Sequence, residues 1–276
     1  MVRTARATHL IVDLPDKPVT RDAALALATL LGRSDREFAA ICFDGFHLDT
    51  LRFDVLIRPY ASAPPPPSTP GAAECLLGPD YVIVHDELVA AARSKNADGS
   101  RVPTRLLVTQ GGSDPCHATP EIVQALADAF PALDIHVVIG PSFAPDDRSR
   151  IDALVRAHAN ILAVYAPEHL ADELLQSDIA VTSGGLTKYE TALFGVPTVF
   201  YSQTDEEASH ALAFARLGCA EYAGPASAVD PAALIALIDE LVRNQDRRQR
   251  MASAGRAAVD GNGARRVVEF IERYRR

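Results

Sequence analysis

The sequence predicts an α/β protein in which two units are each built around a parallel β-sheet. Short apolar runs typical of strands alternate with amphipathic helices along the 276 residues, and such alternation favours parallel strands joined by right-handed crossovers. A polar stretch with Pro and Gly at 93–105 predicts a linker between the units. Pairs of glycines follow two of the predicted strands, at the sheet edge where ligands bind in such folds.

The first predicted unit covers residues 1–98 and holds fewer elements than the second. Its apolar runs predict strands at 8–15, 38–46 and 53–60, a helix at 21–31, and a strand that leads into a helix at 81–89. The segment 61–74 is too rich in proline for a helix or a central strand, so we expect a surface loop there.

The second predicted unit covers residues 99–276 and has a regular rhythm of strands and helices. Strands are predicted within 105–114, 134–141, 160–166, 178–185 and 197–202. Helices are predicted at 119–130, 144–158, 167–177, 186–195, 206–218, 230–244, 246–260 and 264–276.

The composition excludes several classes of function. The net charge is -9 and no dense run of Lys or Arg occurs, so we expect no nucleic-acid partner. No apolar stretch reaches transmembrane length and no signal peptide is recognisable, which makes the cytoplasm the expected location. The four cysteines have neither CxxC nor metal-ligand spacing, so we expect no metal and no cofactor.

Two glycine-rich turns are the main candidates for a ligand site. Gly111-Gly112 and Gly184-Gly185 each stand between a predicted strand and a predicted helix. Glycine lets a backbone approach a ligand closely, and a helix N-terminus supplies free N–H groups that suit a diphosphate. The alternative is that either pair serves only tight packing.

Single acidic residues near these turns have two interpretations. Glu190 accepts hydrogen bonds from a ribose, or it forms a capping box with Thr187. Asp13 and Asp44 end neighbouring predicted strands, where each serves as a base or substrate anchor, or merely caps the following turn.

Four stretches carry a resemblance to a known family: LLGPDYVIVHDEL, LLVTQGGSDPCHAT, DIAVTSGGLTKYETALFGVPTV and ARLGCA. Together they resemble the UDP-sugar hydrolases of the pseudaminic acid pathway and the related spore-coat-polysaccharide glycosyltransferase-like proteins. They are more distantly similar to the donor domain of the peptidoglycan N-acetylglucosaminyltransferase. The resemblance covers about residues 8–225 and is strongest at 75–89, 106–119 and 178–199.

The resemblance implies a GT-B fold of two Rossmann-like domains, the second of which binds a nucleotide-sugar, in this family a UDP-sugar. It implies that Gly111 and Gly112 border the cleft and that backbone atoms of Tyr165 and Ala166 meet the base. It further implies a ribose contact from Glu190. The diphosphate would be held by Ser183, Gly184, Gly185 and Thr187.

The chain departs from the family pattern at several functional positions. The family's G-x-G-H loop does not occur in this sequence, and Leu14-Pro15 stand where an aromatic residue often follows the aspartate. This suggests a truncated N-terminal domain. Glu206-Glu207 align with the family's Asn-Gln pair, and His85 stands where the family usually has Arg.

The function we predict is a nucleotide-sugar-dependent glycosyltransferase or hydrolase that breaks the anomeric C–O bond. Asp13, Asp44 or His85 would activate the nucleophile, which is water or a small hydroxyl compound. One alternative is a catalytically inactive homologue that binds nucleotide-sugars or regulates another protein. Another is one half of an enzyme whose missing part comes from a second chain, and a homodimer is also consistent with the sequence.

Overall fold

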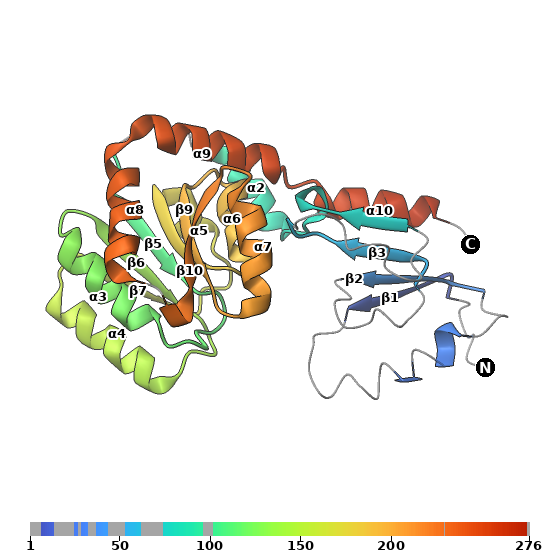
Figure 1. Cartoon of the computed structure of the whole chain (residues 1–276), viewed down its shortest axis with the longest axis horizontal. Helices are drawn as coiled ribbons and strands as arrows, with labels where there is room; N and C mark the ends of the chain where they lie inside the picture. The colour runs from blue at the N-terminus through green and yellow to red at the C-terminus, as the bar shows by residue number, and fades with distance from the viewer. Residues whose placement is uncertain are drawn as a thin grey trace. The chain divides into compact units, whose positions relative to one another are not determined.

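The protein divides into two compact units. The structure, a computed structural model, describes residues 7–13, 25–26, 29–32, 37–43, 53–61, 74–95, 102–228 and 230–274, although not the side chains of residues 205, 206 and 209. The first unit comprises residues 1–83 and 262–276, and the second comprises residues 84–261. Figure 1 labels most of the helices and strands of both.

In its described part, the first unit holds a sheet of four parallel strands in the order β1-β2-β3-β4. They are β1 (His9–Asp13), β2 (Ala39–Phe43), β3 (Val55–Arg58) and β4 (Glu74–Leu77). Alternate residues of β2 belong to different apolar clusters, Cys42 to one and Ile41 to the other. A parallel strand buried on both faces reads as a continuous apolar run, which is why the sequence predicted this strand.

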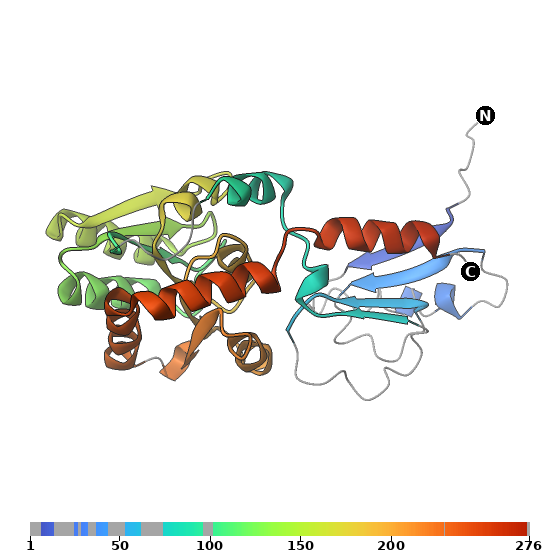
Figure 2. The same cartoon turned by 90° about the horizontal axis from the view of Figure 1, so that it is seen from above.

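Helix α10 (Gly263–Arg273) belongs to the first unit, although we predicted the closing helix as part of the second. Val267 is buried in the cluster that contains Ile41 and Val55, and Phe270 packs against it. Figure 2 shows the helix, in red, lying along the sheet. The periodicity of α10 predicts an apolar face, but it carries no information on which sheet covers that face.

The predicted division at residue 98 also differs from the structure, which divides the chain after residue 83. Residues 82–85 form no strand, although a strand was predicted there, and the chain runs from the short 3-10 helix η1 (Pro79–Tyr81) into α2 (Asp86–Ser94). Val82 and Val84 are nevertheless buried, which explains their apolar character. Helix α2 packs against α5 and α6 of the second unit and therefore belongs to it.

The second unit is a doubly wound α/β sheet of parallel strands in the order β10-β9-β8-β5-β6-β7. Its strands are β5 (Arg105–Thr109), β6 (Asp134–Ile139), β7 (Ile161–Tyr165), β8 (Ile179–Ser183), β9 (Thr198–Ser202) and β10 (Ala220–Pro225). The chain runs outward from β5 to β7, returns to β8 beside β5, and runs outward again to β10. The order of the strands therefore reverses between β5 and β8.

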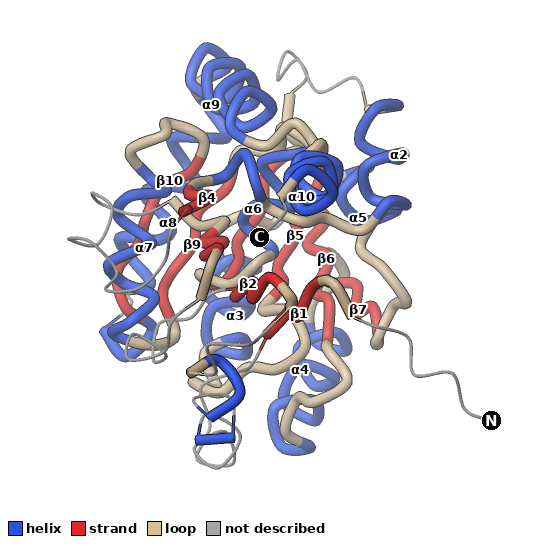
Figure 3. The backbone as a smooth tube through the Cα atoms, turned by 90° about the vertical axis from the view of Figure 1, so that its right-hand side faces the viewer, coloured by secondary structure: helices blue, strands red, loops and turns tan. Residues whose placement is uncertain are grey.

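Helices cover both faces of this sheet (Figure 3). On one face lie α3 (Thr119–Ala129), α4 (Pro145–Ala157) and α8 (Pro231–Arg243). On the other lie α2, α5 (Ala171–Gln176), α6 (Thr187–Leu193) and α7 (Asp205–Ala215). Helix α9 (Gln245–Ala258) packs against α6 and α8. The central apolar cluster joins β5, β6 and β8 to α3 and α8, and the predicted α/β architecture is confirmed.

Strand β10 was not predicted, because its sequence AEYAGP contains Gly and Pro and its side chains are mostly only partly buried. It lies at the edge of the sheet, where such residues are tolerated. Within the described ranges, no helix has the combination of length and apolar character needed to cross a membrane.

Candidate nucleotide site

The topology of the second unit places the candidate site. In doubly wound sheets a crevice opens at the carboxyl ends of the strands where the strand order reverses. Here that point lies between β5 and β8. The two glycine-rich turns predicted from the sequence directly follow these two strands, so the fold brings them to the same edge of one sheet.

A pocket of about 470 Å³ opens at this edge of the sheet. Six of its lining residues were predicted from the sequence: His85, Gly111, Gly112, Ala166, Thr187 and Glu190. The turns after β5, β6 and β7 supply one side of the pocket, and the first turn of α6 together with the start of α2 supplies the other. Residues from five elements therefore meet around one space of the size of a small-molecule site.

The turn after β5 depends on glycine at two levels. Gly111 has φ 75°, a left-handed conformation that glycine adopts without steric cost. Gly140, in the turn after β6, packs directly on this turn, because a Cβ at Gly140 would overlap the carbonyl oxygens of Gly111 and Gly112. The N–H of Ser142 donates to the Gly112 carbonyl at 2.9 Å. The two turns thus form one interlocked wall of the pocket.

The end of β7 has an unusual backbone at Ala166. Its φ is 39°, which is uncommon for a residue with a side chain and costs of the order of 1 kcal/mol. The N–H of Ala166 donates to the Ile139 carbonyl at 2.8 Å. What Ala166 offers the pocket from its backbone is therefore its carbonyl oxygen. The next residue, Pro167, has no N–H and also lines the pocket.

Glu190 lies one turn into α6 and lines the pocket. The capping-box interpretation is wrong: α6 begins at Thr187, the N-cap is Leu186, and no side chain caps this helix. Burial raises the pKa of the Glu190 carboxyl, and a hydrogen bond with Thr187 partly opposes that shift. Among the described residues no charged group shifts this pKa, so the partly buried carboxylate is placed to accept hydrogen bonds from a ligand.

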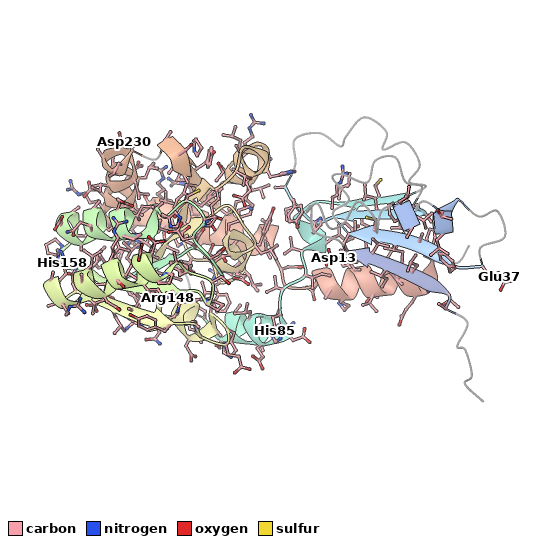
Figure 4. The ribbon with its side chains drawn as sticks, turned by 90° about the horizontal axis from the view of Figure 1, so that it is seen from below. Asp13, Glu37, His85, Arg148, His158 and Asp230 are labelled. Atoms are coloured by element: carbon pink, nitrogen blue, oxygen red, sulfur yellow. The ribbon has the colours of Figure 1, made fainter. Side chains whose placement is uncertain are left out.

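His85 lines the pocket and is the N-cap of α2, and Figure 4 shows it at the start of that helix. Its Nδ1 accepts from the N–H of Glu87 at 3.4 Å, so in the neutral ring the proton is assigned to Nε2. Glu87 also pairs with Nε2 of His169 at 3.2 Å, and both of these residues line the pocket.

Several predicted site residues lie elsewhere. Tyr165 is exposed outside the pocket, and its hydroxyl donates to Asp152. Asp13 ends β1 in the first unit, as Figure 4 shows. Asp44 and the side chain of Glu206 lie outside the described residues. Ser183, Gly184, Gly185 and Glu207 belong to the second unit but are not among the lining residues of this pocket.

The turn after β8 is held by buried polar groups. Ser183 is 4% exposed, and its hydroxyl donates to the Gln110 carbonyl at 3.4 Å. The Glu207 carboxylate accepts from the N–H of Gln203 at 2.7 Å. A Cβ at Gly184 would lie 3.1 Å from that carboxylate, a tight contact that favours glycine here. Helix α6 has only seven residues and therefore a weak dipole. An anion bound at this turn would be held mainly by the backbone N–H groups of the turn.

Other lining residues were missed by the sequence analysis. They are Glu87, Leu88, Thr109, Val138, Gly140, Pro141, Pro167, Glu168, His169 and Leu170. Most of them directly follow β6 or β7 or begin α2. The residues after each predicted strand could therefore have been proposed as lining residues, because ligands bind at the carboxyl ends of such strands. Among the residues described, no group of three or more His, Cys, Asp or Glu side chains is placed to hold a metal ion.

Comparisons with known proteins point to glycosyltransferase-like relatives. No family model matches the chain. It is 26% identical to the spore coat polysaccharide biosynthesis protein SpsG of Bacillus subtilis over 196 residues, which are 71% of this chain and 57% of SpsG. It is 31% identical over 183 residues to the UDP-N-acetylglucosamine–N-acetylmuramyl-(pentapeptide) pyrophosphoryl-undecaprenol N-acetylglucosamine transferase of Salinibacter ruber, covering 62% of this chain and 48% of the transferase.

The fold has counterparts among solved structures. The UDP-GlcNAc 2-epimerase of Neisseria meningitidis bound to UDP-GlcNAc superimposes with a TM-score of 0.62 at 15% identity, covering 98% of this chain and 76% of the epimerase. The GT-B-like fold of two Rossmann-like units, expected from the resemblance, is confirmed. The chain spans about half the length of the two sequence relatives above.

Proposed function

We propose that the second unit binds a UDP-sugar and that the chain acts on the anomeric C–O bond of this donor. The observation that carries the proposal is the pocket at the carboxyl ends of β5, β6 and β7, with Glu190 facing it from α6. The similarity to a transferase named for a UDP-linked donor, and to an epimerase bound to UDP-GlcNAc, supports uridine diphosphate as the nucleotide. The acceptor is a hydroxyl compound in a glycosyltransferase and water in a hydrolase.

The pocket suggests how the donor is arranged. The base lies at the end of β7, where the Ala166 carbonyl accepts from a base N–H, and the ribose hydroxyls donate to the Glu190 carboxylate. This order leaves the diphosphate between the turn at Gly111-Gly112 and the turn at Ser183–Gly185. Thr187 lines the pocket beside this place, and its hydroxyl donates to the Glu190 carboxylate that meets the ribose.

The charge of the pocket determines which groups bind the phosphates. Its lining carries the carboxylates of Glu87, Glu168 and Glu190, and none of the residues described there is Lys or Arg. A diphosphate in this pocket therefore depends on backbone N–H groups and neutral donors. These groups point at the β-phosphate oxygen on which charge develops as the anomeric C–O bond breaks. Such fixed donors stabilise a leaving diphosphate without rearrangement during the reaction.

The bonds made by His85 assign its role. Because Nδ1 accepts from the N–H of Glu87, Nε2 of the neutral ring carries a proton and donates. His85 therefore fits a hydrogen-bond donor to the diphosphate better than a base. Asp13 and Asp44 remain our candidates for the base that activates the acceptor.

The position of Glu207 favours a functional donor site over an inactive relic. Its carboxylate lies against Gly184, accepts from the N–H of Gln203 and acts electrostatically on Lys188. A carboxylate that is paired in this way does not repel a diphosphate as an unpaired one would.

Isothermal titration calorimetry with uridine, UMP, UDP and UDP-GlcNAc tests the proposed function. We expect UDP to bind at least about tenfold more tightly than uridine, which corresponds to about 1.4 kcal/mol from the diphosphate. Release of UDP from UDP-GlcNAc, with and without an added sugar acceptor, then separates hydrolysis from transfer. The proposal is wrong if neither UDP nor any other nucleoside diphosphate binds to the folded chain.

Replacing Glu190 with glutamine should weaken UDP binding while leaving the protein as stable as before. The carboxylate accepts charge-assisted hydrogen bonds from the ribose, which are about twice as strong as neutral ones, so we expect a loss of roughly tenfold in affinity. Burial raises the pKa of Glu190, so the charged form is disfavoured in the folded state and its removal should not lower the melting temperature.

The pH dependence gives an independent check on Glu190. Because the bonds to ribose need the carboxylate, the UDP affinity of the natural chain should fall as the pH drops through the raised pKa of this group. The Glu190→Gln variant should lack that component. A variant that loses thermal stability and keeps its affinity would make Glu190 a structural residue.

A further inference from the structure

Lys188, the second residue of α6, is the most deeply buried ammonium group described in the second unit. The residue is 3% exposed. Its Nζ donates to the carbonyl of Gly184, and to the carbonyl of Gly185 at 3.1 Å. The ammonium also lies 4.7 Å from the centre of the Tyr189 ring and 5.7 Å from that of Phe214. The lysine therefore faces the interior and not the pocket.

The bonds made by Lys188 fix the direction of two peptide planes. In a trans peptide the C=O of one residue and the N–H of the next point in opposite directions. Since the carbonyls of Gly184 and Gly185 point at the buried ammonium, the N–H groups of Gly185 and Leu186 point away from it. Neither of these N–H groups donates to another described residue, and Leu186 is 54% exposed.

We infer that Lys188 is a positioning residue of the donor site: its ammonium holds the two carbonyls inward so that the N–H groups of Gly185 and Leu186 face the diphosphate. This inference rests on the proposed function, because the N–H groups need an anion to bind. It explains how a pocket without Lys or Arg in its described lining can accept a diphosphate. The Lys188 ammonium does not touch the phosphates but orients the N–H groups that bind them.

The surroundings of Lys188 fit this role. Among the described residues, Glu207 on α7 is the charged group that acts on the ammonium, and β8, β9, α2 and α9, which pack against α6, contribute none. Burial lowers the pKa of Lys188 to about 8, and Glu207 opposes this shift. The group is therefore mostly charged at neutral pH, and it loses its charge at a higher pH than the terminal phosphate of UDP, whose second pKa is about 6.

The test compares UDP with uridine in the natural chain and in Lys188→Met, which keeps an unbranched apolar stem. We expect Lys188→Met to bind UDP at least about tenfold more weakly, through the loss of one charge-assisted contact pair. Uridine affinity should change less than about threefold, because the base and ribose contacts do not involve this turn. If Lys188→Met is folded and binds both ligands more weakly by the same factor, the positioning role is wrong.

A second variant keeps the inference testable where Lys188→Met does not fold. Glu207→Gln removes the charge that supports the ammonium, so its UDP affinity should fall at a lower pH than that of the natural chain between pH 7 and 8.5. Superimposable pH profiles for the two proteins would contradict the inference. If the natural chain binds UDP and Lys188→Met binds it equally well, the proposed function stands and the positioning role is wrong. If the natural chain binds no nucleoside diphosphate, both are wrong.

Discussion

Replacing Gly140 with alanine should weaken UDP binding by more than about tenfold and destabilise the second unit. The new Cβ would overlap the carbonyl oxygens of Gly111 and Gly112, and it would lie 2.5 Å from the carbonyl carbon of Gly112. These are backbone atoms of the pocket wall and cannot rotate away, so the turns after β5 and β6 must separate. Overpacking of this kind costs about 1–3 kcal/mol of unfolding free energy.

The expected loss of affinity exceeds about tenfold, because Gly111 and Gly112 in the pocket lining both move and the hydrogen bond from Ser142 to Gly112 is strained. Thermal denaturation and calorimetry with UDP measure the two effects. Gly112→Ala is the matched control for stability, since a Cβ there has no heavy atom within 4 Å and the melting temperature should stay nearly unchanged. Equal stability of the two variants would mean that the turns are not interlocked.

Replacing Gly263 with alanine should loosen the first unit. Gly263 begins α10, and a Cβ there would overlap the carbonyl oxygen of Val82 and lie 2.7 Å from its carbonyl carbon. The helix must shift along its whole length to relieve this overlap. Val267 then leaves its place beside Ile41 and Val55, and the expected cost is about 1–3 kcal/mol or more.

Hydrogen exchange of the amides in β2 and β3 measures this loosening directly, because these strands lie under α10. Their protection should fall in Gly263→Ala. The control is Arg265→Ala on the same helix, which removes an exposed ion pair with Glu269 worth no more than about 0.5 kcal/mol. Unchanged protection in Gly263→Ala, with the helix still formed, would mean that close packing at this glycine does not anchor the helix.

The candidate site was only partly predictable. Residues whose role follows from their position along the chain were found, and residues whose role depends on contacts with distant parts of the chain were not. Gly111, Gly112, Thr187 and Glu190 were found because each lies at a strand end or in the helix turn after one, and a parallel sheet brings such positions together. Gly140 was missed because its need for glycine comes from a neighbouring turn that lies about thirty residues earlier in the chain. Lys188 was passed over because a sequence does not tell a buried lysine from a solvated one.

The fold shows the same division. By itself, the sequence determined that buried apolar runs alternate with amphipathic helices, since burial on one face or both imposes a local period, and this fixed the parallel α/β class. Only the tertiary structure decided where the units divide, that β4 and β10 are strands, and which sheet receives α10. An edge strand needs little apolar character, and an amphipathic helix fits any apolar surface of the right shape, so those choices depend on contacts between residues far apart in the chain.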